Sequence, residues 1–259
     1  MPRITEIVAY EDDRGNRIIG PSPIPHPNGS VLFNGRNCTL ILEEGVTFQC
    51  GIQFLQSDSE VTIGKKSCVR GGLQLGDGAK ILIGENLSVT GNLTITVDDG
   101  ATVRIGDDCL FAANVQLRAY DSHPIYDLRT GKRTNFSRSI TIGNRVWMGY
   151  DSAALGGAYV GDGSIVGFRS VVTAGSKIPT HSLAVGQPAK AVKYFVAWAK
   201  NGNPPSPEMA DLDSYPAPSE LPYFNNNDGQ KASIRLKAAR KLASSATRLV
   251  ERLEANQSN

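Results

Sequence analysis

Apolar residues recur at every sixth position through the second half of the chain. The series consists of Ile142, Met148, Ala154, Val160, Val166, Val172 and Ile178. A helix spaces its apolar residues about 3.6 apart and a half-buried strand spaces them two apart. A period of six therefore predicts a short strand and a turn that recur in space. The pattern indicates a solenoid that buries the sixth-position side chains inside.

Shorter runs with the same spacing come before this stretch, and the phase slips between them. They cover Ile63–Ile81, Ile83–Ile95 and Ile105–Leu117. At one slip, Asp98, Asp99 and Gly100 supply turn-forming residues, which predict a longer corner and not an end to the solenoid. Glycine follows several of the apolar positions and suits tight corners because it has no Cβ. We therefore predict an all-β solenoid over residues 33–183.

Both ends of the chain depart from the repeat. Residues 1–32 combine a candidate hairpin around Asp12–Gly15 with a proline-rich stretch, and we expect them to cap the open end of the solenoid. Residues 184–200 follow the last repeats. Residues 201–230 are rich in Pro, Asn, Asp and Ser and are typical of an extended linker, whereas residues 231–259 have the apolar spacing of one helical face. We expect a C-terminal basic amphipathic helix there.

Charge is concentrated in this predicted helix. The chain carries a net charge of +2, and residues 231–259 alone carry seven basic and two acidic residues, or +5, which leaves −3 for the rest. The helix is expected to pack on the solenoid or on a neighbouring subunit. The alternative is contact with an anionic glycan, a lipid carrier or the inner face of a membrane. The remaining charge pattern does not indicate a nucleic-acid partner.

Composition also bears on location and metal binding. No apolar run approaches twenty residues and no basic-then-apolar leader follows Met1, so we expect a cytoplasmic protein. The four cysteines lack C-x-x-C spacing and are expected to be buried thiols in a reducing compartment. A metal-dependent lyase would need three converging histidines, and the chain has three in all, widely spaced. We expect no metal site.

A polar, basic excursion over residues 119–139 interrupts the repeat. Long loops in compact folds commonly carry function. This one contains His123, and an imidazole suits a general base because it titrates near neutral pH. Taken alone, such a histidine is more often structural. Asp121, two residues earlier, is a candidate to orient the ring, with a backbone carbonyl as the alternative.

Three motifs in and after the excursion carry a family resemblance. They are Asp121-Ser-His-Pro124, Ile142-Gly-x-x-Val-Trp-Met-Gly149 and the terminal Gly186-Gln-Pro-Ala-Lys190. Together they closely resemble the sugar O-acetyltransferase branch of the hexapeptide-repeat acyltransferases. The resemblance covers about residues 60–195 and implies a left-handed parallel β-helix. Spacing alone does not fix the hand, and the general rule for parallel crossovers favours a right-handed one. The family's eighteen-residue coils would also stack Cys50 on Cys68.

The resemblance implies an acetyl-CoA-dependent O-acetyltransferase that acts on a capsular or lipopolysaccharide-type surface glycan. It implies His123 as the general base, Trp147 as an active-site tryptophan, and a homotrimer with active sites between subunits. The residues implied to bind acetyl-CoA are Gly149, Tyr150, Gly167, Phe168, Arg169, Thr173, Lys177, Lys190 and Lys193, and residues 184–200 are implied to be the terminal coenzyme-binding segment. The resemblance adds Asn92 as an acceptor residue, and the excursion offers Tyr126, Arg129, Lys132, Arg133 and Asn135 for hydrogen bonding to a hydroxyl-rich or acidic glycan.

Departures from the family pattern leave alternatives open. Phe168 and Arg169 stand where relatives commonly have small residues, so they would pack on the adenine or bind a phosphate. Two extra residues before Lys177 put its alignment in question. The alternative acceptor is small: an antibiotic, an amino acid or a nucleotide sugar. A non-catalytic scaffold would not require His123, the excursion and Trp147 together. No cysteine or serine near His123 has a clear nucleophile setting, so we expect direct transfer in a ternary complex.

Overall fold

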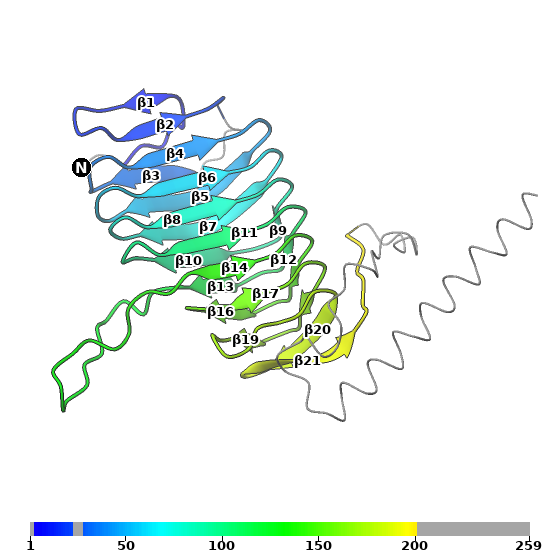
Figure 1. Cartoon of the computed structure of the whole chain (residues 1–259). Coiled ribbons are helices and arrows are strands. Elements are labelled where there is room, and N and C mark those ends of the chain that lie inside the picture. The colour runs from blue at the N-terminus through cyan, green and yellow to red at the C-terminus, as the bar shows by residue number, and fades with distance from the viewer. Residues whose placement is uncertain (1–2, 23–27, 201–259) are drawn as a thin grey trace, which may run out of the picture. The chain divides into compact units, whose positions relative to one another are not determined.

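The computed structural model describes residues 3–22 and 28–200. The segments predicted as linker, 201–230, and as basic helix, 231–259, lie outside these residues. The described part of the chain is all-β, a left-handed parallel β-helix of about eight coils. Its strands stack in order along the axis (Figure 1). The fold class expected from the repeat is confirmed.

Three strands build each coil, so the solenoid has three faces. The first face is formed by β2 (Arg17–Ile19), β4 (Thr39–Leu42), β6 (Glu60–Ile63), β8 (Lys80–Ile83), β11 (Thr102–Ile105), β14 (Ile140–Ile142) and β17 (Tyr159–Val160). The second carries β9 (Ser88–Val89), β12 (Leu110–Phe111), β15 (Trp147–Met148), β18 (Ile165–Val166) and β20 (Ser182–Gly186). The third carries β3 (Ser30–Phe33), β10 (Leu93–Val97), β13 (Val115–Arg118), β16 (Ala153–Leu155) and β19 (Val171–Val172).

Two long strands join the second and third faces. They are β5 (Thr47–Phe54) and β7 (Cys68–Leu75), of eight residues each. β7 pairs with β9 at Cys68 and with β10 from Gly71 onward, because its chain passes the corner without leaving the strand. Alternate side chains of β5 point into the core, as the period of a strand requires. The predicted sixth-position residues are buried in the same way, including Val160 and Val172.

Coil length varies along the axis, which corrects one expectation. Thr47 pairs with Cys68 and Cys50 pairs with Gly71, a step of 21 residues in both cases. Cys50 and Cys68 are therefore not in register, and an eighteen-residue repeat was wrong for these coils. It holds later, where Trp147 pairs with Ile165. The reason is a longer third face, since β10 and its corner span residues 93–101 whereas β16 and its corner span 153–158.

The ends of the solenoid differ from its body. β1 (Tyr10–Glu11) pairs antiparallel with β2, and β2 begins the parallel ladder by pairing with β4. At the other end β20 pairs antiparallel with β21 (Ala189–Tyr194). The four cysteines are free thiols, and burial raises the pKa of the Cys109 thiol to about 12.

Candidate functional site

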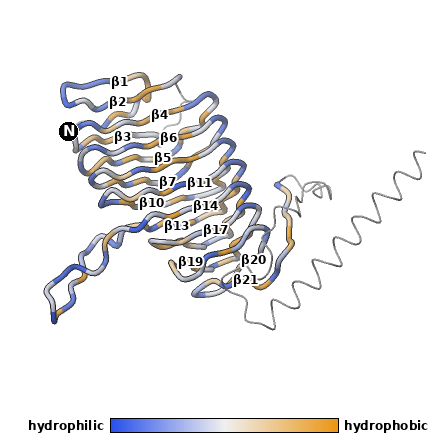
Figure 2. The backbone as a smooth tube through the Cα atoms, in the orientation of Figure 1, coloured by the Kyte–Doolittle hydropathy of each residue, from blue (hydrophilic) through white to orange (hydrophobic). Residues whose placement is uncertain are grey.

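Residues 119–139 connect β13 to β14 and project from the corner between the third and first faces (Figure 1). They are hydrophilic along most of their length (Figure 2). At the root of the excursion the Thr96 hydroxyl donates to the Tyr120 carbonyl oxygen at 3.2 Å. Further out the excursion folds on itself through an antiparallel bridge between Tyr126 and Arg133. It is therefore an ordered arm, and its polar sequence suits a solvent-facing role.

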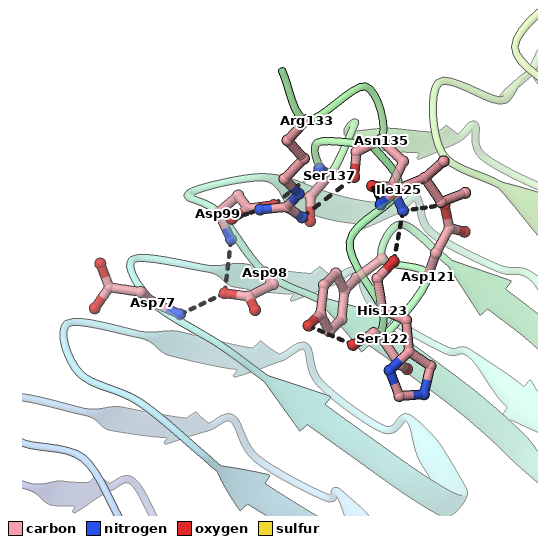
Figure 3. A network of polar contacts seen from close by, with 11 residues as sticks. Asp77, Asp98, Asp99, Asp121, Ser122, His123, Ile125, Arg133, Asn135 and Ser137 are labelled. Atoms are coloured by element: carbon pink, nitrogen blue, oxygen red, sulfur yellow. Dashed lines mark hydrogen bonds and ion pairs between the residues drawn. The ribbon is translucent and has the colours of Figure 1, made fainter. Parts of the chain in front are cut away.

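His123 is exposed on this arm, and its backbone is fixed by a neighbour. The Asn135 side-chain amide donates to the His123 carbonyl oxygen at 2.8 Å and to the Asp121 carboxylate at 3.2 Å. The imidazole points away from Asn135 and Asp121 (Figure 3). Asp121 is thus engaged by Asn135, and the expected contact between its carboxylate and the His123 ring is not formed.

Two of the proposed acceptor residues serve the arm itself. The Arg133 guanidinium donates to both carboxylate oxygens of Asp99, at 3.2 and 2.9 Å, and lies 4.6 Å from the Phe136 ring centroid. The Asn135 side-chain oxygen accepts from the Ile125 amide at 2.6 Å. Arg133 and Asn135 therefore hold the arm together, and their polar atoms are largely occupied.

The remaining acceptor candidates are open to solvent. Tyr126 is exposed, and so are Lys132 and Arg129 at the tip of the arm. Arg129 pairs with Asp127 at 2.7 Å, but its side chain stays 88% exposed, so it remains accessible to a ligand. Asn92 lies apart from them, at the corner before β10, and is exposed.

A cluster of aromatic and charged side chains occupies a different corner, between the second and third faces. The Tyr150 and Phe168 rings stack with centroids 5.8 Å apart. The Arg169 guanidinium lies 4.9 Å from the Phe168 centroid and pairs with Asp151 at 3.2 Å. Phe168 remains 62% exposed. This corner thus presents an aromatic surface with a cation beside it, which suits a planar or anionic group.

Close packing between coils explains why glycine occupies two positions at this corner. A Cβ on Gly149 would lie 2.8 Å from the Val166 carbonyl oxygen, and one on Gly167 would lie 2.7 Å from a Val185 methyl carbon. Their amides donate to the next coil, at 2.7 and 2.8 Å. Both glycines therefore let adjacent coils approach closely, and their amides are already occupied.

Trp147 faces outward from β15 and meets a residue that the sequence did not indicate. Its ring centroid lies 6.1 Å from that of Trp198, and the Trp198 indole donates to the Arg145 carbonyl oxygen at 2.7 Å. After β21 the chain therefore turns back over the coils, and Lys200 donates to the Asn86 carbonyl oxygen at 3.0 Å. The two tryptophans are 51 residues apart in the sequence, and no local pattern links them.

The other predicted coenzyme residues lie toward the C-terminal end of the solenoid. Lys190 and Lys193 are exposed on β21, and Lys177 is exposed before Ile178. The Thr173 hydroxyl is 3.1 Å from that of Ser176.

Among residues 3–22 and 28–200 no group of three metal-ligating side chains was found. Nor does that part of the chain contain a helix long and apolar enough to span a membrane.

The predicted site residues thus form two separate groups. His123 and the arm emerge from the corner between the third and first faces, whereas Trp147 and the Tyr150–Phe168 stack belong to the second face and its following corner. The contacts described do not join the two groups. Asp99 and Trp198 were missed by sequence reasoning, since their partners are distant in sequence.

Comparison with known proteins gives sugar acetyltransferases. The chain is 34% identical over 140 residues to polysialic acid O-acetyltransferase of Escherichia coli O1:K1, a match that covers 54% of this chain and 45% of the relative. It is 30% identical over 171 residues to the putative lipopolysaccharide biosynthesis O-acetyl transferase WbbJ of Escherichia coli K12, covering 62% of this chain and 81% of that protein. The chain spans about half the length of the polysialic acid relatives that it matches.

A solved structure agrees with these matches in fold. The polySia-specific acetyltransferase NeuO superposes with a TM-score of 0.64 and 31% sequence identity, over 73% of this chain and 84% of that chain. No family model matches the sequence.

Proposed function

The chain belongs to the hexapeptide-repeat acetyltransferases, and from that premise we propose that it transfers the acetyl group of acetyl-CoA to a sugar hydroxyl of a surface glycan. The observation that carries the proposal is the exposed imidazole of His123 on an ordered arm. Asn135 fixes the backbone of this residue, while the exposed His123 ring points away from Asn135 and Asp121 (Figure 3). The exposed ring, on a backbone that Asn135 holds, can meet an incoming hydroxyl.

The proposed reaction is a direct transfer in a ternary complex. The acceptor hydroxyl attacks the thioester carbonyl carbon as His123 takes its proton. A C–O bond forms, and the tetrahedral intermediate then expels the coenzyme thiolate as the C–S bond breaks. The proton on His123 passes to that sulfur, which leaves the imidazole neutral for the next cycle. The intermediate needs a hydrogen-bond donor at its oxyanion.

The aromatic corner is the proposed coenzyme site. The Tyr150–Phe168 stack offers a flat apolar surface to an adenine ring, and Arg169 adds a positive charge beside it. The exposed lysines of β21, Lys190 and Lys193, would meet the phosphates, because ammonium groups bind phosphate through charge-assisted hydrogen bonds. Trp147 would contact the acetyl end, with Thr173 and Lys177 as further proposed contacts.

The arm tip is the proposed acceptor surface. Arg129 and Lys132 are exposed cations, and Tyr126 adds an exposed phenol, so the tip suits an acidic, hydroxyl-rich glycan. Asn92 is proposed as a further hydrogen-bonding residue near the sugar. Arg133 and Asn135 are better explained as residues that hold the arm, since Asp99 and the arm backbone already occupy them.

The separation of the two groups supports a multimeric site. His123 and Trp147 belong to different sides of one solenoid, so a site that uses both would need a second copy of the chain. We propose a homotrimer in which the arm of one subunit reaches the aromatic corner of the next.

The test is coenzyme A release from acetyl-CoA with polysialic acid, lipopolysaccharide and simple galactosides as acceptors. We expect release with one glycan class and a loss of about 100- to 10,000-fold in kcat for His123→Ala, the range of general-base catalysis. Asp77→Asn, on an exposed corner residue one coil before Asp99, is the matched control and should retain activity. Full activity of His123→Ala would refute the assignment of the base, and stimulation by small hydroxyl compounds alone would favour the small-acceptor alternative.

A further inference from the structure

We infer that Asp99 is a positioning residue for His123 and acts through Arg133, Ser137 and Asn135. The inference rests on the proposed function only in taking His123 as the base. It concerns how the solenoid fixes that residue in space. The four residues lie along one continuous set of hydrogen bonds from a coil corner to the His123 backbone (Figure 3).

The network begins on a rigid corner. The Asp98 carboxylate is largely buried and accepts the Asp77 amide at 2.8 Å and the Asp99 amide at 2.7 Å. It therefore ties the corner of one coil to the corner of the preceding coil. A Cβ on Gly76 would lie within 2.0 Å of Asp98 carboxyl atoms, so the two corners pack closely against each other at this point. Asp99 is thus presented by a fixed part of the fold.

Asp99 then receives four donors from the arm. The Arg133 guanidinium supplies two, at 3.2 and 2.9 Å, and the Ser137 amide and hydroxyl each supply one at 3.0 Å. An arginine that binds both carboxylate oxygens fixes direction as well as distance. The arm is thereby anchored well beyond its roots, and Arg133 cannot swing freely.

Asn135 connects the anchored part of the arm to His123. Its own carbonyl oxygen accepts from Arg133 at 3.2 Å, and its side chain spans the arm between the Ile125 amide and the His123 carbonyl oxygen. Asp99 is 24 residues from His123 in the sequence, but Arg133 and Asn135 are the only residues between them along this route. Loss of Asp99 would free the outer arm and, with it, the base.

The partial exposure of the Arg133–Asp99 ion pair determines whether its loss should change activity or stability. The Arg133 and Asp99 side chains are 20% and 27% exposed, and partly exposed ion pairs contribute little to global stability. A misplacement of about 1 Å at a catalytic group, in contrast, can cost about 100-fold in rate. The network should therefore affect kcat much more than unfolding.

The test uses Asp99→Asn and Arg133→Gln in the full chain. Asp77→Asn is the matched control, because Asp77 joins the network through its main-chain amide, which the substitution keeps. For Asp99→Asn we expect kcat to fall about 10- to 100-fold, KM for acetyl-CoA to stay within about twofold, and the thermal midpoint to stay within about 2 °C. The double variant should be no worse than the more affected single variant, because both changes break one connection.

A second measurement is independent of activity. The chain has three histidines, so the imidazole carbon–proton NMR signal of His123 can be assigned from its loss in His123→Ala. We expect this signal to move toward the value of an unstructured peptide in Asp99→Asn and to stay unchanged in Asp77→Asn. If no acceptor is ever turned over but the signal shifts in this way, the positioning role stands and the proposed function fails. Wild-type kcat together with an unchanged signal in Asp99→Asn would overturn the inference.

Discussion

Two adjacent glycines of β7 should respond oppositely to the same substitution. Gly71 has φ +118, and a Cβ there would lie 2.1 Å from the Leu93 carbonyl oxygen and 2.7 Å from the Asn92 side-chain oxygen. At Gly72 no atom lies within 4 Å of an added Cβ. The two positions share one strand, one coil and the same two neighbouring strands, β5 and β10, so Gly72→Ala is a matched control for Gly71→Ala.

The magnitude follows from two costs at Gly71. Holding an alanine in a backbone region that only glycine adopts readily costs about 1–3 kcal/mol. Moving the β10 backbone away from the new methyl adds about 1–3 kcal/mol, the usual cost of overpacking. We therefore expect Gly71→Ala to lower the free energy of unfolding by about 2–6 kcal/mol. Gly72→Ala has neither cost and should change stability by about +0.4 to +1 kcal/mol through the unfolded chain.

Urea titration followed by circular dichroism would measure both variants against the wild type. Repeat proteins can unfold in parts, so the urea midpoints should be compared between variants whose unfolding transitions have the same slope. Displacement of Asn92 by the new methyl should also raise the KM for the acceptor in Gly71→Ala but not in Gly72→Ala. Equal midpoints for the two variants would refute the register of β7 against β10.

Two further predictions concern the side chains that sequence reasoning missed. Trp198→Ala removes an aromatic contact of about 0.5–1.5 kcal/mol and exposes Trp147 further, which becomes the only tryptophan in the chain. The fluorescence emission of Trp147 should therefore lie to the red of its emission in Trp198→Phe, and equal emission in the two variants would contradict the packing. At Asp99, partial burial raises the pKa, but hydrogen bonds from Ser137 and Arg133 outweigh it and hold the pKa below its ordinary value. The contribution of the ionised Asp99 is then complete above the pKa of the unfolded chain, about 4, and is lost only as the pH falls through the lower pKa of the folded state. The measurement is an NMR titration of the Asp99 carboxyl carbon, assigned with Asp99→Asn. A midpoint at or above about 4 would contradict this prediction.

The sequence determined the kind of fold because inward and outward positions alternate locally along each coil. A period of six at Val160, Val166 and Val172 is enough to predict buried positions, and these three are buried. The same reading identified the segment that joins β13 to β14, because the repeat stops and resumes at definite residues. Hydrophobic periodicity indicates burial residue by residue, so buried positions can be predicted without knowledge of distant contacts.

Only the tertiary structure decided coil length and long-range pairing. Cys50 and Cys68 are eighteen residues apart, yet they are out of register because the third face is longer in the early coils. Arg133 binds Asp99 across 34 residues and Trp198 meets Trp147 across 51. Such pairs depend on how many residues each coil takes and how a loop folds back, and no local pattern records either. The sequence by itself therefore determined the solenoid and offered His123 as a candidate base, whereas the fold decided which residues contact the backbone of that histidine.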